Sequence, residues 1–211
     1  ALITPRTLLV AALLAVLGYA GNYLALPIAY GMSFIFGSIF SIIAIVLLGG
    51  CWGVMVSIIA ASYTFILWNH PYAIIIFAME ALWIGLALRR GYANLVFIDA
   101  LFWLSLGWIS VVVFYGAIMD LGAQSVLMIG LKQSINGLFN ALIASLILYI
   151  PLIRKQARYA FSTYTYKNMM FNAIAVFLMV PTLSLLLFDN YRENIALKKH
   201  AASKVQAETY A

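Results

Sequence analysis

The sequence predicts an all-α membrane protein: a compact bundle of six transmembrane helices, followed by a seventh transmembrane helix and a helical connector. Of the 211 residues, 66% are hydrophobic and only 9% are charged, which excludes an ordinary soluble domain. The apolar residues form seven long runs, and very short loops join the first six. Short loops make successive helices antiparallel neighbours, so these six runs are expected to pack as one bundle.

Each predicted helix is an apolar run with few or no charges inside it. The runs cover residues 7–28, 31–51, 53–68, 71–88, 95–119, 125–152 and 169–188. The third and fourth runs lie near the lower limit for a membrane crossing, about 17–20 residues, so we expect shallow or tilted crossings there. Pro71 suits the first turn of the fourth helix, whereas Pro181 removes a backbone donor and should kink the seventh.

The runs divide the chain into four predicted parts. Residues 1–153 form the six-helix domain, and residues 169–189 form the seventh transmembrane helix. Residues 154–168 mix basic and aromatic side chains, which suit a linker lying in the cytoplasmic headgroup layer; an unstructured charged loop is the alternative. Residues 190–211 carry a short heptad pattern that predicts a helical connector, which either transmits a conformational change or acts as a spacer. Because the chain starts with Ala and stops inside this pattern, we expect a fragment of a longer protein, in which the connector leads to a downstream output domain.

The placement of the positive charges, within a net charge of +6, predicts the orientation. The basic residues of one alternate set of loops are Arg6, Arg89, Arg90, Arg154, Lys155, Arg158 and Lys167. The opposite loops, near residues 22–30, 69–70 and 119–124, carry no Lys or Arg. This distribution puts the N-terminus in the cytoplasm and the tail after Asp189 outside, although basic residues in that tail weaken the last step. It also favours membrane lipids, and not nucleic acid, as the partner of these charges.

Charged side chains inside the apolar runs identify a candidate site. Lys132 lies near the middle of the sixth run, where a buried ammonium costs about 2.5–3.5 kcal/mol and needs a partner. Residues 132, 136 and 140 share one helix face, so Lys132, Asn136 and Asn140 form a polar stripe. Glu80 lies at nearly the same depth in the antiparallel fourth run. The two charges are therefore predicted to anchor a ligand together or to form a structural ion pair.

Polar and aromatic residues gather toward the predicted outer half of the bundle, which is typical of a small-molecule pocket. The candidate ligand-binding residues are Lys132, Glu80, Gln133, Asn136, Asn22, Tyr63, Trp68, Asn69, His70 and Tyr115. In the alternative interpretation, the ion pair holds helices together and the aromatic residues form an interfacial belt. His70 is either a ligand contact or a pH-responsive group, or neither. Asp99 is interpreted as a capping carboxylate at a helix N-terminus.

Enzyme and metal functions lack support in the sequence. Two distant histidines, one cysteine and six carboxylates do not supply a closed metal shell. No phosphate-binding loop, nucleophile elbow or zinc-protease motif is present. We therefore expect no catalytic residues, no metal and no cofactor.

Four segments together resemble a known family: GMSFIFGSIF at 31–40, LGGCWG at 48–53, SYTFILWNHPY at 62–72 and LKQSINGLFN at 131–140. With the six-helix spacing, residues 7–153 resemble the vitamin-uptake-like sensor modules of bacterial histidine kinases and cyclic-di-GMP enzymes. These modules are similar to the S components, the substrate-binding subunits, of energy-coupling-factor transporters. The resemblance implies a six-helix fold that binds a small metabolite at its outer face and performs no chemistry.

The resemblance implies an input domain of a signalling protein in the bacterial cytoplasmic membrane, dimeric through its last helix and connector. The alternative is a transporter subunit, because Ala11 and Ala15 match the Ala-x-x-x-Ala pattern with which S components dock to their coupling subunit. A membrane anchor without a ligand is the third hypothesis. Amino acids, purines and vitamins all remain open as ligands.

Overall fold

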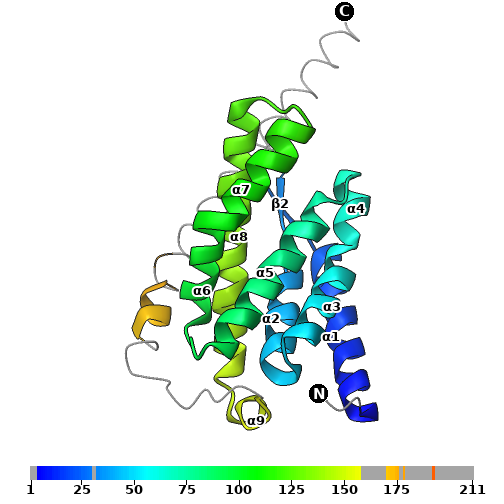
Figure 1. Cartoon of the computed structure of the whole chain (residues 1–211), viewed down its shortest axis with the longest axis vertical. Coiled ribbons are helices and arrows are strands. Elements are labelled where there is room, and N and C mark those ends of the chain that lie inside the picture. The colour runs from blue at the N-terminus through cyan, green and yellow to red at the C-terminus, as the bar shows by residue number, and fades with distance from the viewer. Residues whose placement is uncertain (1–3, 30–31, 158–169, 176–177, 179–191, 193–211) are drawn as a thin grey trace, which may run out of the picture.

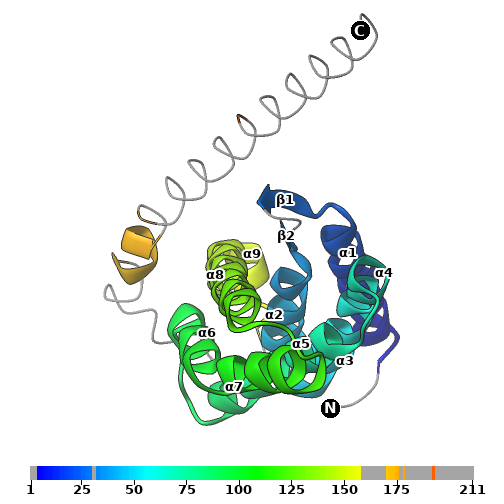
Figure 2. The ribbon, with the colours of Figure 1, turned by 90° about the horizontal axis from the view of Figure 1, so that it is seen from above.

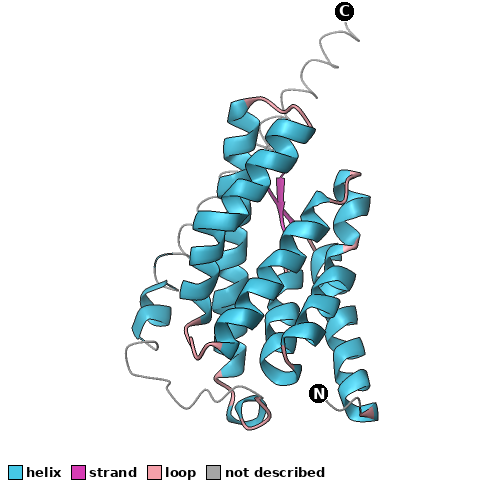
Figure 3. Cartoon of the chain, viewed as in Figure 1, coloured by secondary structure: helices cyan, strands magenta, loops and turns pink. Residues whose placement is uncertain are grey.

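The computed structural model describes residues 4–29, 32–157, 170–175, 178 and 192. These residues are mostly helical, with one two-stranded hairpin (Figure 3). The expectation of a helical bundle is confirmed, but the hairpin departs from the predicted all-α class. Most of the predicted linker, most of the seventh helix and nearly all of the connector lie outside the described residues, so their predictions stand untested.

The elements follow one another in the order shown in Figure 1. They are α1 (Pro5–Tyr23), β1 (Leu26–Ala29), β2 (Met32–Phe34), α2 (Gly37–Leu48), α3 (Gly50–Ala61), α4 (Tyr63–Trp68), α5 (Tyr72–Arg89), α6 (Leu95–Phe102), η1 (Trp103–Gly107), α7 (Trp108–Val111), η2 (Val112–Ile118), α8 (Ala123–Leu148) and α9 (Pro151–Arg154). The segments η1 and η2 are π-helical and continue the helix that α6 begins.

Within the described residues, five helices are long and apolar enough to cross a membrane, which indicates a membrane protein. They are α1 (Pro5–Tyr23), α3 continued by α4 (Gly50–Trp68), α5 (Tyr72–Arg89), α6 continued through η2 (Leu95–Ile118) and α8 (Ala123–Leu148). The third and fourth predicted runs thus correspond to helices of 19 and 18 residues. Among the described apolar helices, α2 is too short to cross a membrane, because it has 12 residues and no helix continues it, whereas α4 extends α3. The chain before α2 forms the hairpin instead of a helix. Pro27, which lacks a backbone N–H, lies in β1, where the sequence predicted the end of the first transmembrane helix.

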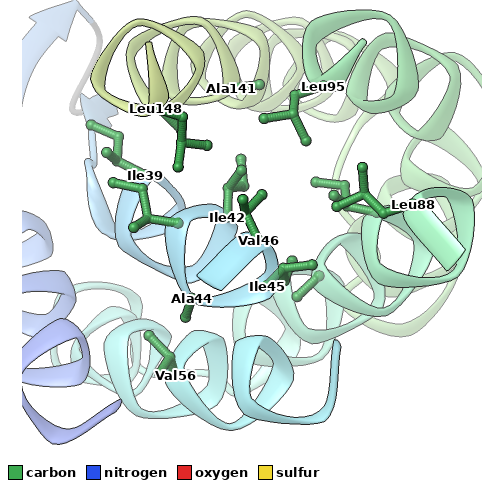
Figure 4. Close-up of a cluster of buried hydrophobic side chains, with 14 of the residues drawn as sticks. Ile39, Ile42, Ala44, Ile45, Val46, Val56, Leu88, Leu95, Ala141 and Leu148 are labelled. Atoms are coloured by element: carbon green, nitrogen blue, oxygen red, sulfur yellow. The ribbon is translucent and has the colours of Figure 1, made fainter. Parts of the chain in front are cut away.

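The short helix α2 occupies the centre of the bundle. It packs against α1, α3, α5 and α8, and Figure 2 shows it between α8 on one side and α1 and α3 on the other. Its residues Ala44, Ile45 and Val46 are fully buried, and Ala44 faces Val56 of α3 (Figure 4). A helix that is apolar on all sides lies either in a protein core or against lipid. Here the helices α1, α3, α5 and α8 surround α2, and it forms part of the core.

Glycines allow the tight reversal between α2 and α3. Gly49 has a φ of 106°, a conformation that is strained for residues with a side chain. A Cβ atom on Gly85 of α5 would lie 3.0 Å from the Cα atom of Gly50. The absence of side chains at these positions lets α3 follow α2 directly and lets α5 approach α3 closely.

Three asparagines hold the non-helical backbone between the hairpin and α2. Asn136 accepts a hydrogen bond from the Ile35 N–H at 2.8 Å and donates to the Ile35 carbonyl at 3.0 Å. Asn140 donates to the same carbonyl at 2.9 Å. Asn22 accepts from the Gly37 N–H at 2.6 Å and donates to the Ala60 carbonyl at 2.7 Å. Irregular backbone at membrane depth is tolerated only when protein groups satisfy it in this way.

The two ends of the bundle differ in charge. Figure 1 shows the start of α1, the α5–α6 connection and α9 at one end, with the α4–α5 and η2–α8 turns at the other. The first end carries Arg6, Arg89, Arg90 and Lys155. The Nη2 atom of Arg6 donates a hydrogen bond to Gln156 at 2.9 Å, which joins the start of α1 to the chain after α8. The alternation in the sequence between loops with and without Lys or Arg thus corresponds to two opposite ends of the bundle.

Replacing Asn136 by Leu should destabilise the fold. The substitution leaves the buried Ile35 N–H without an acceptor, so the free energy of unfolding should fall by about 1–3 kcal/mol. Chemical unfolding in mild detergent measures this change. The control is Ser134→Ala on the same helix, because the Ser134 hydroxyl group donates to the Gly130 carbonyl of its own helix and ties no other segment to α8 among the described residues. An unchanged unfolding midpoint for Asn136→Leu would contradict the anchoring role.

Candidate ligand-binding site

A cavity of about 270 Å³ lies at the end of the bundle opposite the basic residues. Its lining comes from α4, the α4–α5 turn, η2 with the turn after it, and α8. The lining residues are Trp68, His70, Tyr115, Met119, Leu121, Ile129, Lys132 and Gln133. Five of the ten candidate ligand-binding residues therefore meet here, namely Trp68, His70, Tyr115, Lys132 and Gln133.

Lys132 points its charge at an aromatic face in this cavity. Its Nζ atom lies 4.4 Å from the centroid of the Trp68 ring, and only 9% of the residue is exposed. The cation–π contact compensates part of the cost of burying an ammonium group. No carboxylate approaches Lys132 among the described residues, so an anion bound in the cavity would complete its environment.

The predicted ion pair between Glu80 and Lys132 is wrong. The Glu80 carboxyl group accepts hydrogen bonds from Ser38 Oγ at 2.8 Å and from Trp103 Nε1 at 2.9 Å. Equal depth along two helices does not fix the direction in which each side chain points. Glu80 faces α2 and η1, whereas Lys132 faces Trp68.

Gln133 has hydrogen-bonding capacity that the fold leaves unused. Its side chain is 2% exposed, and its Oε1 atom is buried without a hydrogen-bond partner in the described structure. Buried polar groups are normally satisfied, and exceptions are frequent at functional sites. A polar ligand group in the cavity would satisfy this amide.

Aromatic rings form one wall of the cavity. The His70 ring stacks on Tyr72 at a centroid distance of 5.3 Å and lies edge-on to Tyr115 at 5.1 Å. The Trp68 ring also stacks with the His70 ring, at a centroid distance of 6.3 Å. Asn69 ends α4 in the left-handed conformation, with a φ of 55°, and so turns the chain at His70. The π-helical segment η2 carries Tyr115 on this wall.

The other candidate residues have structural environments outside the cavity. Asn22 and Asn136 bind the backbone around Ile35 and Gly37, as described above. Tyr63, at the start of α4, packs against Tyr19 and Tyr23 of the last turns of α1. Sequence reasoning missed Met119, Leu121 and Ile129, which line the cavity. Apolar residues of this kind give no signal in a chain that is two-thirds apolar.

Asp99 does not cap a helix, contrary to the sequence prediction. Asn94 is the cap of α6, and its side chain accepts a hydrogen bond from the Phe97 N–H. Asp99 lies one turn further along and is completely buried. Its carboxyl group lies beside that of Glu80.

Two further observations concern the class of site. The described part of the chain holds no group of three His, Cys, Asp or Glu residues that could bind a metal ion. No protein-family model, curated protein or solved structure matches the chain.

His70 should make the stability of the folded protein sensitive to acid. Burial lowers the pKa of His70 below its usual value of about 6.5, and a hydrogen bond with the backbone opposes part of this shift. At a pH well above the usual histidine pKa, His70 is neutral in both the folded and the unfolded state. As the pH falls through that value, the unfolded state binds the proton first, so stability is lost.

His70→Gln should therefore reduce the loss of thermal stability between about pH 7.5 and about pH 5.5, the range in which histidine titrates. Thermal unfolding at a series of pH values measures the effect. The control is His200→Gln, at the second histidine of the chain. An equal response to pH in wild type and His70→Gln would refute this assignment.

Proposed function

We propose that this chain is the input domain of a bacterial membrane signalling protein, which binds a small anionic molecule from the outer side of the cytoplasmic membrane. The observation that carries the proposal is the buried ammonium group of Lys132 in an aromatic cavity, which no carboxylate of the described residues approaches. The buried Gln133 Oε1 atom beside it, which has no hydrogen-bond donor among the described residues, supports the same interpretation.

The charge distribution supports an outward-facing cavity. Arg6, Arg89, Arg90 and Lys155 lie at the end of the bundle away from the cavity. Basic residues concentrate in cytoplasmic loops of membrane proteins. With that orientation, Trp68, His70 and Lys132 face the extracytoplasmic side.

The chemistry of the lining supports an anionic ligand with a flat apolar part. A carboxylate on the ligand would pair with the Lys132 ammonium, and a ligand N–H or O–H would donate to Gln133 Oε1. The rings of Trp68, His70 and Tyr115 offer faces and edges for stacking. A volume of about 270 Å³ is below the range of about 300–1,000 Å³ usual for drug-sized ligands, which favours a molecule the size of an amino acid or a nucleobase.

The environment of α1 favours a sensor over a transporter subunit. Ala11 and Ala15, which match the docking pattern of S components, are only 6% and 4% exposed. Their methyl groups pack inside the bundle, where α1 contacts α2 and α3. Small residues with this spacing serve close helix packing in many membrane proteins. A coupling subunit would find little of these two alanines on the surface.

In the proposed sensor, the signal leaves through the seventh helix and the connector, which pair two copies of the chain. The ligand changes the output only if it binds one arrangement of these helices more tightly than another. The bundle itself carries no catalytic role in this proposal.

A thermal-shift screen of the purified chain in detergent tests the proposal. The panel consists of amino acids, nucleobases and carboxylate-bearing vitamins, and a ligand at about 100 times its Kd stabilises the fold by about 2.7 kcal/mol. Lys132→Gln should weaken binding of the stabilising compound by about 10- to 100-fold, because it removes a charge-assisted contact of about 1.5–3 kcal/mol.

The matched control is Lys155→Gln, at an exposed lysine of the opposite end. This variant should bind the compound with wild-type affinity. Equal binding by wild type and Lys132→Gln would contradict the proposed site, and stabilisation by no member of the panel would count against a ligand of this class.

A further inference from the structure

Two carboxyl groups lie together in the interior of the bundle, away from the cavity lining. Glu80 of α5 is 1% exposed and Asp99 of α6 is fully buried. Both residues belong to helices long enough to cross a membrane. The two carboxyl groups lie within hydrogen-bonding reach of each other.

The surroundings of Glu80 favour a carboxylate that accepts hydrogen bonds. Its Oε2 atom accepts from Ser38 Oγ, and its Oε1 atom accepts from Trp103 Nε1. An indole N–H can only donate, so Oε1 must be an acceptor. Gly137 of α8 provides the space for this indole, because a Cβ atom there would collide with Trp103 Nε1. Groups from α2 and η1 thus fix the Glu80 carboxyl group.

Asp99 has no such donors. Neither of its oxygens accepts a hydrogen bond from any N–H or O–H group of the described residues. Glu80 is the charged group that acts on it, and the Lys132 ammonium lies over Trp68 instead. The Asp99 carboxyl group is fully buried, its oxygens accept no hydrogen bond within the described part of the chain, and it lies beside the Glu80 carboxyl group. Two such groups are stable together only if a positive charge or a hydrogen-bond donor lies between them.

A proton meets this requirement. Two carboxylates in contact cannot both ionise, because each charge opposes the other and burial removes the water that would screen them. A protonated carboxyl group has an O–H donor, and Glu80 offers the acceptor beside it. Because Glu80 already receives two donors and Asp99 none, the proton belongs on Asp99.

We propose that Asp99 and Glu80 form an intramembrane proton-binding site, in which Asp99 carries the proton and donates it in a hydrogen bond to Glu80. Any movement that separates α5 from α6, or admits water between them, weakens this hydrogen bond and releases the proton. Proton occupancy is thereby linked to the closed arrangement of the bundle. This inference is independent of the ligand proposed for the cavity.

Infrared spectroscopy of the purified chain in lipid nanodiscs tests the site at neutral pH. The wild type should show the carbonyl stretch of a protonated carboxylic acid. Labelling aspartate with ¹³C at the side-chain carboxyl should shift this band, which identifies an aspartate in the unmutated protein. The isosteric variant Asp99→Asn should lose the band. The control Asp120→Asn, at an exposed aspartate in the η2–α8 turn, should keep it.

Three results would overturn the proposal. Absence of the band from the wild type would mean that both groups are ionised. A band that shifts with ¹³C-glutamate and not with ¹³C-aspartate would put the proton on Glu80. A band present in choline chloride but lost in sodium chloride would mean that the site takes a metal cation in place of the proton.

Discussion

The hairpin, the short helix α2 and the position of the cavity all depend on one set of hydrogen bonds. These bonds join the side chains of Asn22, Asn136 and Asn140 to the backbone of Ile35 and Gly37. Backbone groups without partners in an apolar bundle cost several kcal/mol each, so a chain normally crosses a membrane as continuous helix. Here side-chain amides replace the missing helical bonds. This substitution allows the chain to fold a hairpin and then begin a short helix in the middle of the bundle.

The polar face of α8 has two functions that its sequence does not separate. Asn136 and Asn140 lie at the level where α2 begins and bind its backbone. Lys132, one turn nearer the start of α8, faces the cavity, with Gln133 beside it. Fixing α8 against the start of α2 also fixes the depth of Lys132. The binding site we propose is thus positioned by the same helix that satisfies the interrupted backbone.

The long apolar helices, the basic end of the bundle and five cavity residues were predictable, because the positions of apolar, charged and polar residues along the chain are sufficient to indicate them. The hairpin was not, since residues 26–34 are mostly apolar, and Pro27 and Gly31 mark a break between two helices without indicating strands. The Glu80–Lys132 pair failed because sequence gives the depth of a residue but not the rotation of its helix. Asp99 was misassigned for a similar reason: Asn94 is an equally good cap, and only packing shows that Asp99 faces Glu80. The π-helical turns around Trp103 and Tyr115 have no sequence signal in one chain.

Accessibility of the cavity to water from outside tests the central claim most directly. Cys51 is exposed, so it would first be replaced by Ser. A cysteine introduced by Ile129→Cys, in the cavity lining, should react with a membrane-impermeant thiol reagent added outside intact cells, whereas one introduced by Ala141→Cys, in the buried core, should not. Reaction of Ile129→Cys only after the membrane is permeabilised, or no reaction at all, would contradict an outward-facing binding site.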